Sequence, residues 1–355
     1  MSRLETALEK AGSNHRFDAD EALSLYTKTD LLDLADLAHR RRLKLHPEPL
    51  VTYVVDRNIN YTNVCTSGCL FCAFYRIEKD ADAFIISKSD LDRKISETLE
   101  LGGTQILLQG GMHPGLDLDY YLDLLRHIKG NFPIHIHGFS PTEIASMADM
   151  AELSIDETLS RLMAAGLDSI PGGGAEILVD DVRRKISPNK CDSDTWLGVM
   201  RSAHGLGLKT TATMMFGHLE TPEDIISHLL KIRALQDDTG GFTAFIPWTF
   251  QPDNTRITVE KATAVDYLRT LALSRLVLDN VTNLQASWVT QGDKIAQLAL
   301  SFGANDMGST MIEENVVAAA GVRFRLPEKE IIRLIQTAGY RAVRRDCFYN
   351  PLEAK

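Results

Sequence analysis

The chain has 355 residues, of which 44% are hydrophobic and 24% are charged, and its 38 basic and 48 acidic residues give a formal net charge of −10. That composition is typical of a globular protein with a full core, and it excludes a disordered or fibrous chain. The acidic balance argues against nucleic acid as a partner, and no segment reaches the roughly 18 consecutive apolar residues that membrane insertion requires.

The amino-terminal segment predicts no secretion signal, because residues 1–18 mix charges with single apolar residues. We therefore expect a cytoplasmic protein. Residues 1–50 are expected to form a helical N-terminal extension, since Leu31, Leu34 and Ala38 recur at helical spacing before a proline-containing stretch.

From residue 51 onward, short runs of β-forming residues alternate with amphipathic helices. Such alternation requires a parallel sheet, and eight units favour closure into a (βα)8 barrel of the TIM type. The predicted strands cover residues 52–64, 104–110, 133–139, 167–171, 209–216, 242–249, 284–289 and 303–307. We expect the barrel to span residues 51–325 and residues 326–355 to form a helical tail packed on it.

Glycine-rich or polar clusters follow several predicted strands, among them residues 109–111, 172–176 and 217–220. In a parallel barrel these loops emerge on one rim, which is where such barrels bind their ligands. We therefore expect the chemistry at this rim.

Three of the five cysteines, Cys65, Cys69 and Cys72, lie together after the first predicted strand. In a reducing compartment this clustering predicts metal binding rather than disulfides. Two simpler interpretations are a zinc site completed by a remote Cys or His and a set of buried thiols. A [4Fe–4S] cluster held by three thiolates would instead keep one iron free for another ligand.

The pattern C-x-x-x-C-x-Φ-C after a first barrel strand resembles the signature of the radical S-adenosylmethionine (SAM) enzymes. Other segments resemble the menaquinone and deazaflavin branch of that superfamily: residues 57–65, 71–76, 109–114, 135–141, 210–218 and 239–248. Residues 102–111, 169–178 and 245–252 are most similar to the members that cyclise dehypoxanthine futalosine. The siblings that form aminofutalosine or the deazaflavin FO have a smaller or aliphatic residue where Trp248 stands.

The resemblance implies that Cys65, Cys69 and Cys72 hold a [4Fe–4S] cluster whose open iron binds SAM. It also implies contacts to SAM from Phe71, Gln109, Gly110, Gly111, Ser140, Glu176, Thr213 and Met215. The match is loose on the second strand, where the usual acidic residue is missing, and on the fifth, where Thr213 replaces a glycine.

The implied reaction belongs to menaquinone biosynthesis. A 5′-deoxyadenosyl radical takes the hydrogen from ribose C4′ of dehypoxanthine futalosine, and the carbon radical adds to the benzoate ring. His137 is expected to contact the substrate, and Asp306 and Glu313 are candidate acceptors for the ring proton. A flavodoxin or ferredoxin is implied as electron donor.

Several residues keep a second interpretation. Trp248 either stacks on the benzoate or fills the barrel mouth. The cations Arg183, Arg184, Lys185 and Lys190 are expected to form a solvated helix face. An alternative from another functional class is that the whole chain is a non-catalytic, metal-stabilised binding protein. The concentration of glycine at the strand ends argues against this alternative.

Overall fold

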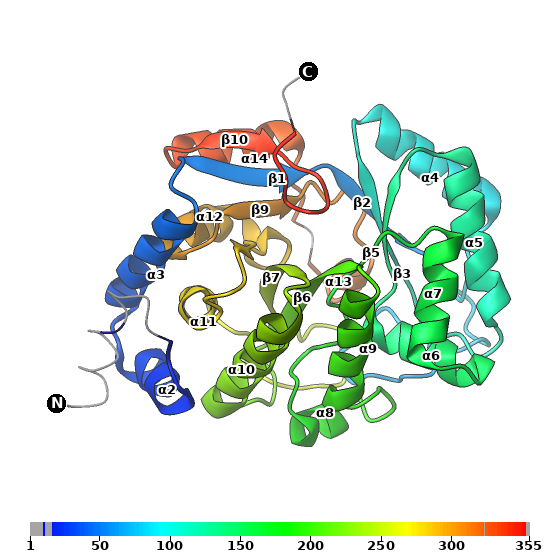
Figure 1. The fold of residues 1–355 in the computed structure, drawn as a ribbon, viewed down its shortest axis with the longest axis horizontal. Helices are drawn as coiled ribbons and strands as arrows, with labels where there is room; N and C mark the ends of the chain where they lie inside the picture. The colour runs from blue at the N-terminus through cyan, green and yellow to red at the C-terminus, as the bar shows by residue number, and fades with distance from the viewer. Residues whose placement is uncertain (1–9, 11–15, 323, 353–355) are drawn as a thin grey trace.

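The structure of the protein is a computed structural model, and it describes residues 10, 16–322 and 324–352. Residues 1–9 and 11–15 of the predicted N-terminal extension and residues 353–355 of the predicted tail lie outside the described residues. Two described helices precede the first strand, α2 (Ala19–Lys28) and α3 (Leu31–Leu45). They pack on the outside of the barrel against α10 (Pro222–Thr239) and α11 (Ala264–Val277) (Figure 1).

A parallel sheet of seven described strands, which follow one another in chain order, forms most of the barrel wall. These strands are β2 (Asp56–Asn60), β3 (Gln105–Gln109), β4 (His135–Gly138), β5 (Ser169–Ile170), β6 (Lys209–Phe216), β7 (Phe242–Thr249) and β8 (Asn283–Leu284). The helices that connect them, besides α10 and α11, are α4 (Lys88–Glu100), α5 (Leu118–Asn131), α6 (Pro141–Ala151), α7 (Ile155–Ala165), α8 (Asp180–Ile186) and α9 (Ser193–Gly205). Figure 1 shows them as an outer layer around the strands.

The ring closes through two further strands. β1 (Leu50–Val54) is separated from β2 by Val55 alone, and it pairs with β9 (Asp306–Ser309). β9 in turn reaches the residue after β8 through a bridge between Asp306 and Gln285. The continuous segment β1–β2 therefore serves as the first barrel strand and β9 as the eighth, which confirms the predicted (βα)8 architecture.

The C-terminal segment differs from the helical tail that we expected. α12 (Trp288–Ala299) and α13 (Val316–Ala319) flank β9, and α14 (Glu328–Thr337) leads into a strand, β10 (Arg341–Arg344). β10 pairs in parallel with β1 and so covers an edge that would otherwise expose unpaired backbone groups. Residues 345–349 then turn inward, seen as the red loop near the middle of the ring in Figure 1.

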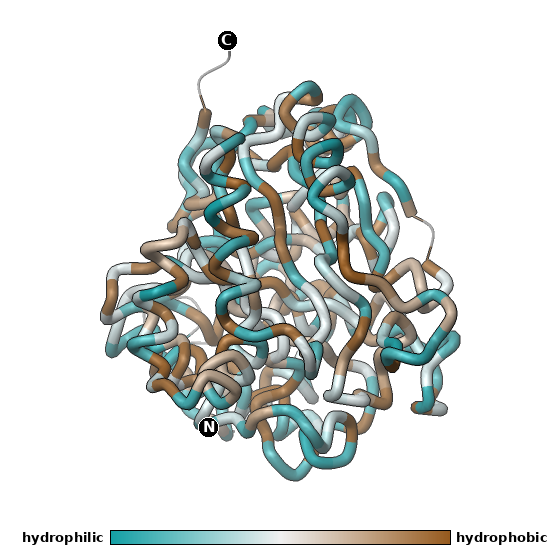
Figure 2. Tube along the Cα trace, turned by 90° about the vertical axis from the view of Figure 1, so that its right-hand side faces the viewer, coloured by the Kyte–Doolittle hydropathy of each residue, from teal (hydrophilic) through white to brown (hydrophobic). Residues whose placement is uncertain are grey.

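Helix boundaries follow the capping signals of the sequence. In α10, Thr221 and Asp224 form a capping box, Pro222 occupies the first helical position, and Gly240 ends the helix with φ 60°. The inward faces of such helices carry the apolar residues, and hydrophobic and hydrophilic segments alternate along the chain in Figure 2. No described helix is both long and apolar enough to cross a bilayer.

Candidate active site

The three cysteines lie on a loop that follows β2 and is held at several points. Backbone bonds join Cys65 N to the carbonyl of Arg76 (3.0 Å) and Leu70 N to the carbonyl of Ile186 (2.8 Å). The guanidinium of Arg256 donates to the carbonyls of Gly68 and Cys69. These bonds hold the loop in place after β2.

The thiols are free, with Cys69 buried and Cys65 and Cys72 half-buried. Burial is the largest effect on the Cys69 thiol and, against the opposing charge of Lys190 and with smaller effects of Glu176 and the other two thiols, raises its pKa to about 12. Within the described ranges, no group of three or more His, Cys, Asp or Glu side chains is arranged so that it could hold a single metal ion. Three thiols on one loop fit a [4Fe–4S] cluster, which is larger than an ion and would keep one iron free.

Lys190 and Glu176 lie beside this loop and form an ion pair in which Glu176 is buried and Lys190 is half-buried. The ammonium of Lys190 lies 5.0 Å from the ring centre of Phe71. The expectation of a solvated helix face is wrong for Lys190, and it is also wrong for Arg183, whose guanidinium donates to the carbonyls of Ala175 and Cys191. Arg183 thereby holds the glycine loop that precedes Glu176.

The glycines after β3 are required by close packing. A Cβ atom on Gly110 would lie 2.6 Å from the Tyr61 ring, and one on Gly111 would lie 2.0 Å from the carbonyl oxygen of Val64. Gly110 N donates to the buried carboxylate of Glu143 (3.1 Å), which also accepts from Tyr61 Oη (2.7 Å). Glu143 was absent from the sequence prediction, where nothing distinguished it from an ordinary helix residue.

The predicted SAM contacts do not all face the same space. Gln109, Glu176 and Thr213 line the central cavity. Ser140 instead caps α6, where its hydroxyl bonds the Glu143 carboxylate (2.5 Å). The Met215 side chain is buried in the core, although its backbone N–H reaches the carbonyl of Glu176 (2.9 Å). Ser140 and Met215 are therefore not among the residues that line the cavity.

The barrel encloses a cavity of about 300 Å³. One part of its wall is apolar or aromatic and another is polar. The apolar part contains Leu107, Ile246, Trp248, Trp288 and Val289, and the polar part contains Asp56, Asn58, His137, Thr211, Gln285, Glu314 and Arg345. Trp248 thus lies where either of its two predicted roles is possible.

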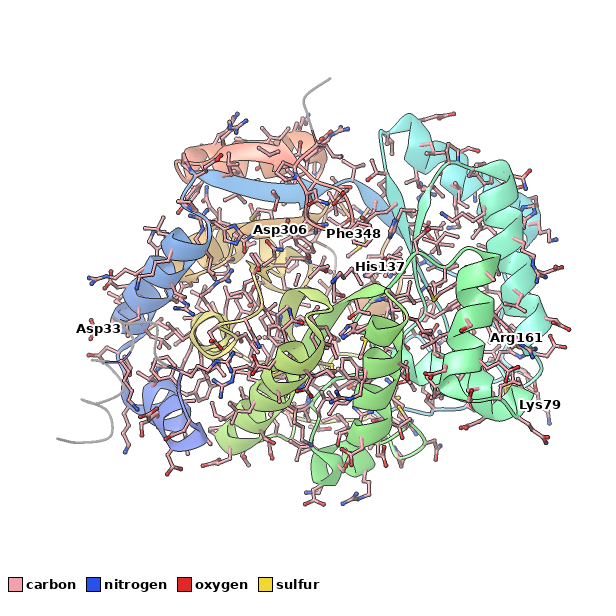
Figure 3. The ribbon with its side chains drawn as sticks, in the orientation of Figure 1. Asp33, Lys79, His137, Arg161, Asp306 and Phe348 are labelled. Atoms are coloured by element: carbon pink, nitrogen blue, oxygen red, sulfur yellow. The ribbon has the colours of Figure 1, made fainter. Side chains whose placement is uncertain are left out.

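His137 faces the cavity and belongs to a buried chain of hydrogen bonds. Its Nδ1 lies 2.7 Å from the hydroxyl of Ser169, which also lies 2.7 Å from His135 Nε2. Burial lowers the pKa of His137 to about 3, so its imidazole is neutral at physiological pH. Figure 3 shows His137 near the middle of the ring.

Asp306 is not available as a proton acceptor. It is fully buried, its carboxylate accepts from Arg345 Nε (2.6 Å) and Thr52 Oγ1 (2.6 Å), and it is not among the residues that line the cavity. Arg345, Cys347 and Tyr349 of the C-terminal segment form part of the cavity wall. The sequence prediction missed these three residues because it treated the segment as an external helix.

Glu313 also lies outside the cavity, because it pairs with Lys94 of α4 and with Arg57 (3.6 Å). The next residue, Glu314, lines the cavity and accepts a bond from Asn58 Nδ2 (2.9 Å). Glu313 and Glu314 thus face opposite sides of the barrel wall. Alternation along β2 explains this, since Arg57 points outward and Asn58 inward and the two glutamates follow the same alternation.

Two sequence patterns of known families together match most of the chain. Residues 59–232 match the pattern described as the radical SAM superfamily, and residues 239–355 match that described as the CofH/MqnC C-terminal region. Among solved structures, methylornithine synthase (PylB) is similar with a TM-score of 0.73 and 18% identity, covering 97% of this chain and 98% of that one. This last likeness concerns the fold alone.

Three curated relatives cover nearly all of the chain. Cyclic dehypoxanthine futalosine synthase of Halalkalibacterium halodurans is 44% identical, with 98% of this chain and 94% of that protein covered. The 5-amino-6-(D-ribitylamino)uracil–L-tyrosine 4-hydroxyphenyl transferase of Methanopyrus kandleri is 41% identical over 93% and 92%. Aminodeoxyfutalosine synthase of Thermus thermophilus is 39% identical over 98% and 95%.

Proposed function

Because the chain belongs to the radical SAM superfamily, we propose that it is a cyclase that converts dehypoxanthine futalosine to its cyclic form in menaquinone biosynthesis. The observation that carries the proposal is the 44% identity, over almost the whole chain, to cyclic dehypoxanthine futalosine synthases from two organisms. The lower identity to the transferase and to aminodeoxyfutalosine synthase makes these the alternatives.

In this proposal Cys65, Cys69 and Cys72 hold a [4Fe–4S] cluster. When bound there, the cluster and SAM supply a 5′-deoxyadenosyl radical, for which a flavodoxin or ferredoxin provides the electron. The cysteine loop positions the three thiols, and Lys190, paired with Glu176, lies against Phe71 of that loop.

SAM is proposed to lie between the cysteine loop and the cavity. Glu176 and Lys190 offer an anion and a cation side by side, which suits the ammonium and carboxylate groups of an amino acid. Phe71, Gln109 and Thr213 are proposed as further contacts, and Gly110 and Gly111 as sites of close backbone approach. These residues orient the bound molecule without taking part in proton transfer.

The cavity below is proposed to hold the substrate. The benzoate ring would pack against Trp248 and the apolar wall, while Asn58, Thr211 and Gln285 would bind sugar hydroxyls. The neutral His137 would contact the substrate through Nε2, since its Nδ1 is bonded to Ser169. Enclosure by the barrel keeps water away from a carbon radical.

The test is anaerobic turnover of the reconstituted, reduced enzyme with each substrate of the three activities in separate reactions. We expect dehypoxanthine futalosine alone to drive formation of 5′-deoxyadenosine, with a product two hydrogens lighter than the substrate. Deoxyadenosine formation driven instead by L-tyrosine with the aminouracil, or by the substrate of aminodeoxyfutalosine synthase, would assign one of the alternatives.

A further inference from the structure

We propose that Glu314 is the base that removes the proton from the benzoate ring after cyclisation. This inference rests on the proposed function, because the proton in question exists only if the ring is attacked by the sugar radical. It replaces the two acceptors predicted from sequence, neither of which lines the cavity.

The position of Glu314 is set by the strand beside it. Backbone bonds join Ile312 N to the carbonyl of Asp56 (3.1 Å) and Asn58 N to the carbonyl of Glu313 (3.3 Å), so the segment after β9 continues alongside β2. Asn315 Nδ2 bonds Asn60 Oδ1 (3.2 Å), and Asn60 is the last residue of β2 before the cysteine loop. Glu314 therefore lies in the cavity wall at the end of the barrel that carries the cysteines.

The carboxylate is held in one orientation by three donors. One oxygen accepts from the backbone N–H groups of Val316 (2.7 Å) and Val317 (2.9 Å), and the other accepts from Asn58 Nδ2 (2.9 Å). These bonds favour the ionised form, while burial acts in the opposite direction and raises the pKa of Glu314. A positioned carboxylate whose proton affinity is increased by burial is suited to general base catalysis.

The other titratable groups in the cavity wall are less suited to the step. Asp56 is buried and accepts from Ser309 Oγ and from Gln105 Nε2 (2.9 Å). As the first residue of β2, it lies farther from the cysteine loop than Asn58, the partner of Glu314. Glu176 is neutralised by Lys190. His137 is a weak base, because burial lowers its pKa to about 3. Burial raises the pKa of Cys347 to about 12 and also raises the pKa of Tyr349, so both side chains keep their own protons. Arg345 is a cation already paired with Asp306 and cannot accept a proton.

The step balances as follows in atoms and charge. Addition of the C4′ radical to an aromatic carbon forms one C–C bond and leaves the unpaired electron delocalised on the ring, with an sp³ carbon that still bears its hydrogen. That C–H bond breaks: its proton goes to the Glu314 carboxylate, and one electron leaves to a one-electron acceptor of the iron–sulfur class. The ring recovers its aromaticity, and the product has two hydrogens fewer than the substrate.

The decisive variant is Glu314→Gln, which keeps the shape of the side chain but removes the base. Its single amide oxygen can accept either from Asn58 or from the backbone N–H groups of Val316 and Val317. Its matched control is Glu313→Gln, one residue away and outside the cavity. We expect Glu314→Gln to bind SAM and substrate normally in calorimetry without reductant, and to form deoxyadenosine, while the ratio of deoxyadenosine to cyclic product rises at least tenfold. A ring-centred radical should accumulate in the EPR spectrum of Glu314→Gln and not in that of the wild type or of Glu313→Gln.

Glu314→Asp is the second variant, in case the glutamine variant folds poorly. It retains a carboxylate at a greater distance from the substrate. We expect a ratio of deoxyadenosine to cyclic product between those of the wild type and Glu314→Gln, and the EPR signal of the ring-centred radical at lower amplitude. A normal ratio of deoxyadenosine to cyclic product in Glu314→Gln would overturn the inference. A raised ratio in His137→Gln together with a normal ratio in Glu314→Gln would also overturn it. If the wild-type enzyme made no deoxyadenosine from dehypoxanthine futalosine, the proposed function itself would fail, and the two failures are thus distinguishable.

Discussion

The side chains of Lys190 and Glu176 form an ion pair beside the cysteine loop while only 13% and 6% exposed, respectively. Replacing Lys190 by Met would leave the Glu176 carboxylate buried without its partner. We expect Lys190→Met to weaken SAM binding about tenfold, as for loss of one charged hydrogen bond. Anaerobic calorimetry on the cluster-loaded protein measures this.

Lys185→Met is the matched control, because Lys185 is an exposed cation five positions earlier in the chain. It should bind SAM as the wild type does. Equal weakening in both variants would mean that general electrostatics, rather than contact with SAM, is responsible.

The second prediction concerns the buried pair of Arg345 and Asp306, whose side chains are 4% and 0% exposed. Arg345→Met leaves Asp306 as an uncompensated charge in the barrel floor and should lower the free energy of unfolding by about 3–5 kcal/mol. The double variant Arg345→Met with Asp306→Asn should recover part of that loss. Urea unfolding followed by circular dichroism measures both, and a double variant less stable than Arg345→Met would contradict the assignment.

The third prediction is a pH dependence of stability. Burial, with smaller effects of Arg183 and Lys231, lowers the pKa of His228 from 6.5 to about 3 in the folded chain. Between these values the unfolded state binds the proton and the folded state does not, so folding stability falls as the pH drops below 6.5. From one such histidine we expect a loss of about 2 kcal/mol by pH 5.

Comparison of urea midpoints at pH 7 and pH 5 for the wild type and His228→Gln measures this contribution. The wild type should lose about 2 kcal/mol more than the variant over that interval. The same loss in both proteins would show that His228 is protonated in the folded chain.

Much of the fold follows from the alternation of strands and helices. The strands β6 and β7 have the predicted bounds, because each is a long β-forming run between clear helix signals. β5 and β8 have two residues each, and their ends were overestimated. The strand β10 was missed because residues 341–344 have only alanine and valine between two arginines, and only pairing with β1 makes this short stretch a strand.

The site was less predictable, because local pattern does not give the direction of a side chain in an irregular loop. Lys190 follows three cations that are typical of a solvated face, yet the chain folds back and buries it against Glu176. Glu313 and Glu314 are equivalent in sequence, and only the pairing of Asn58 with the backbone of this segment fixes which one enters the cavity. Such long-range registers are set by the folded barrel.

The central claim is that this chain directs a deoxyadenosyl radical to the sugar C4′ hydrogen of dehypoxanthine futalosine. The most direct test is turnover of substrate deuterated at C4′, with mass spectrometry of the 5′-deoxyadenosine released by the reduced enzyme. The account predicts that this deoxyadenosine carries one deuterium per molecule. Deoxyadenosine of unlabelled mass, formed while the substrate keeps its deuterium, would contradict it.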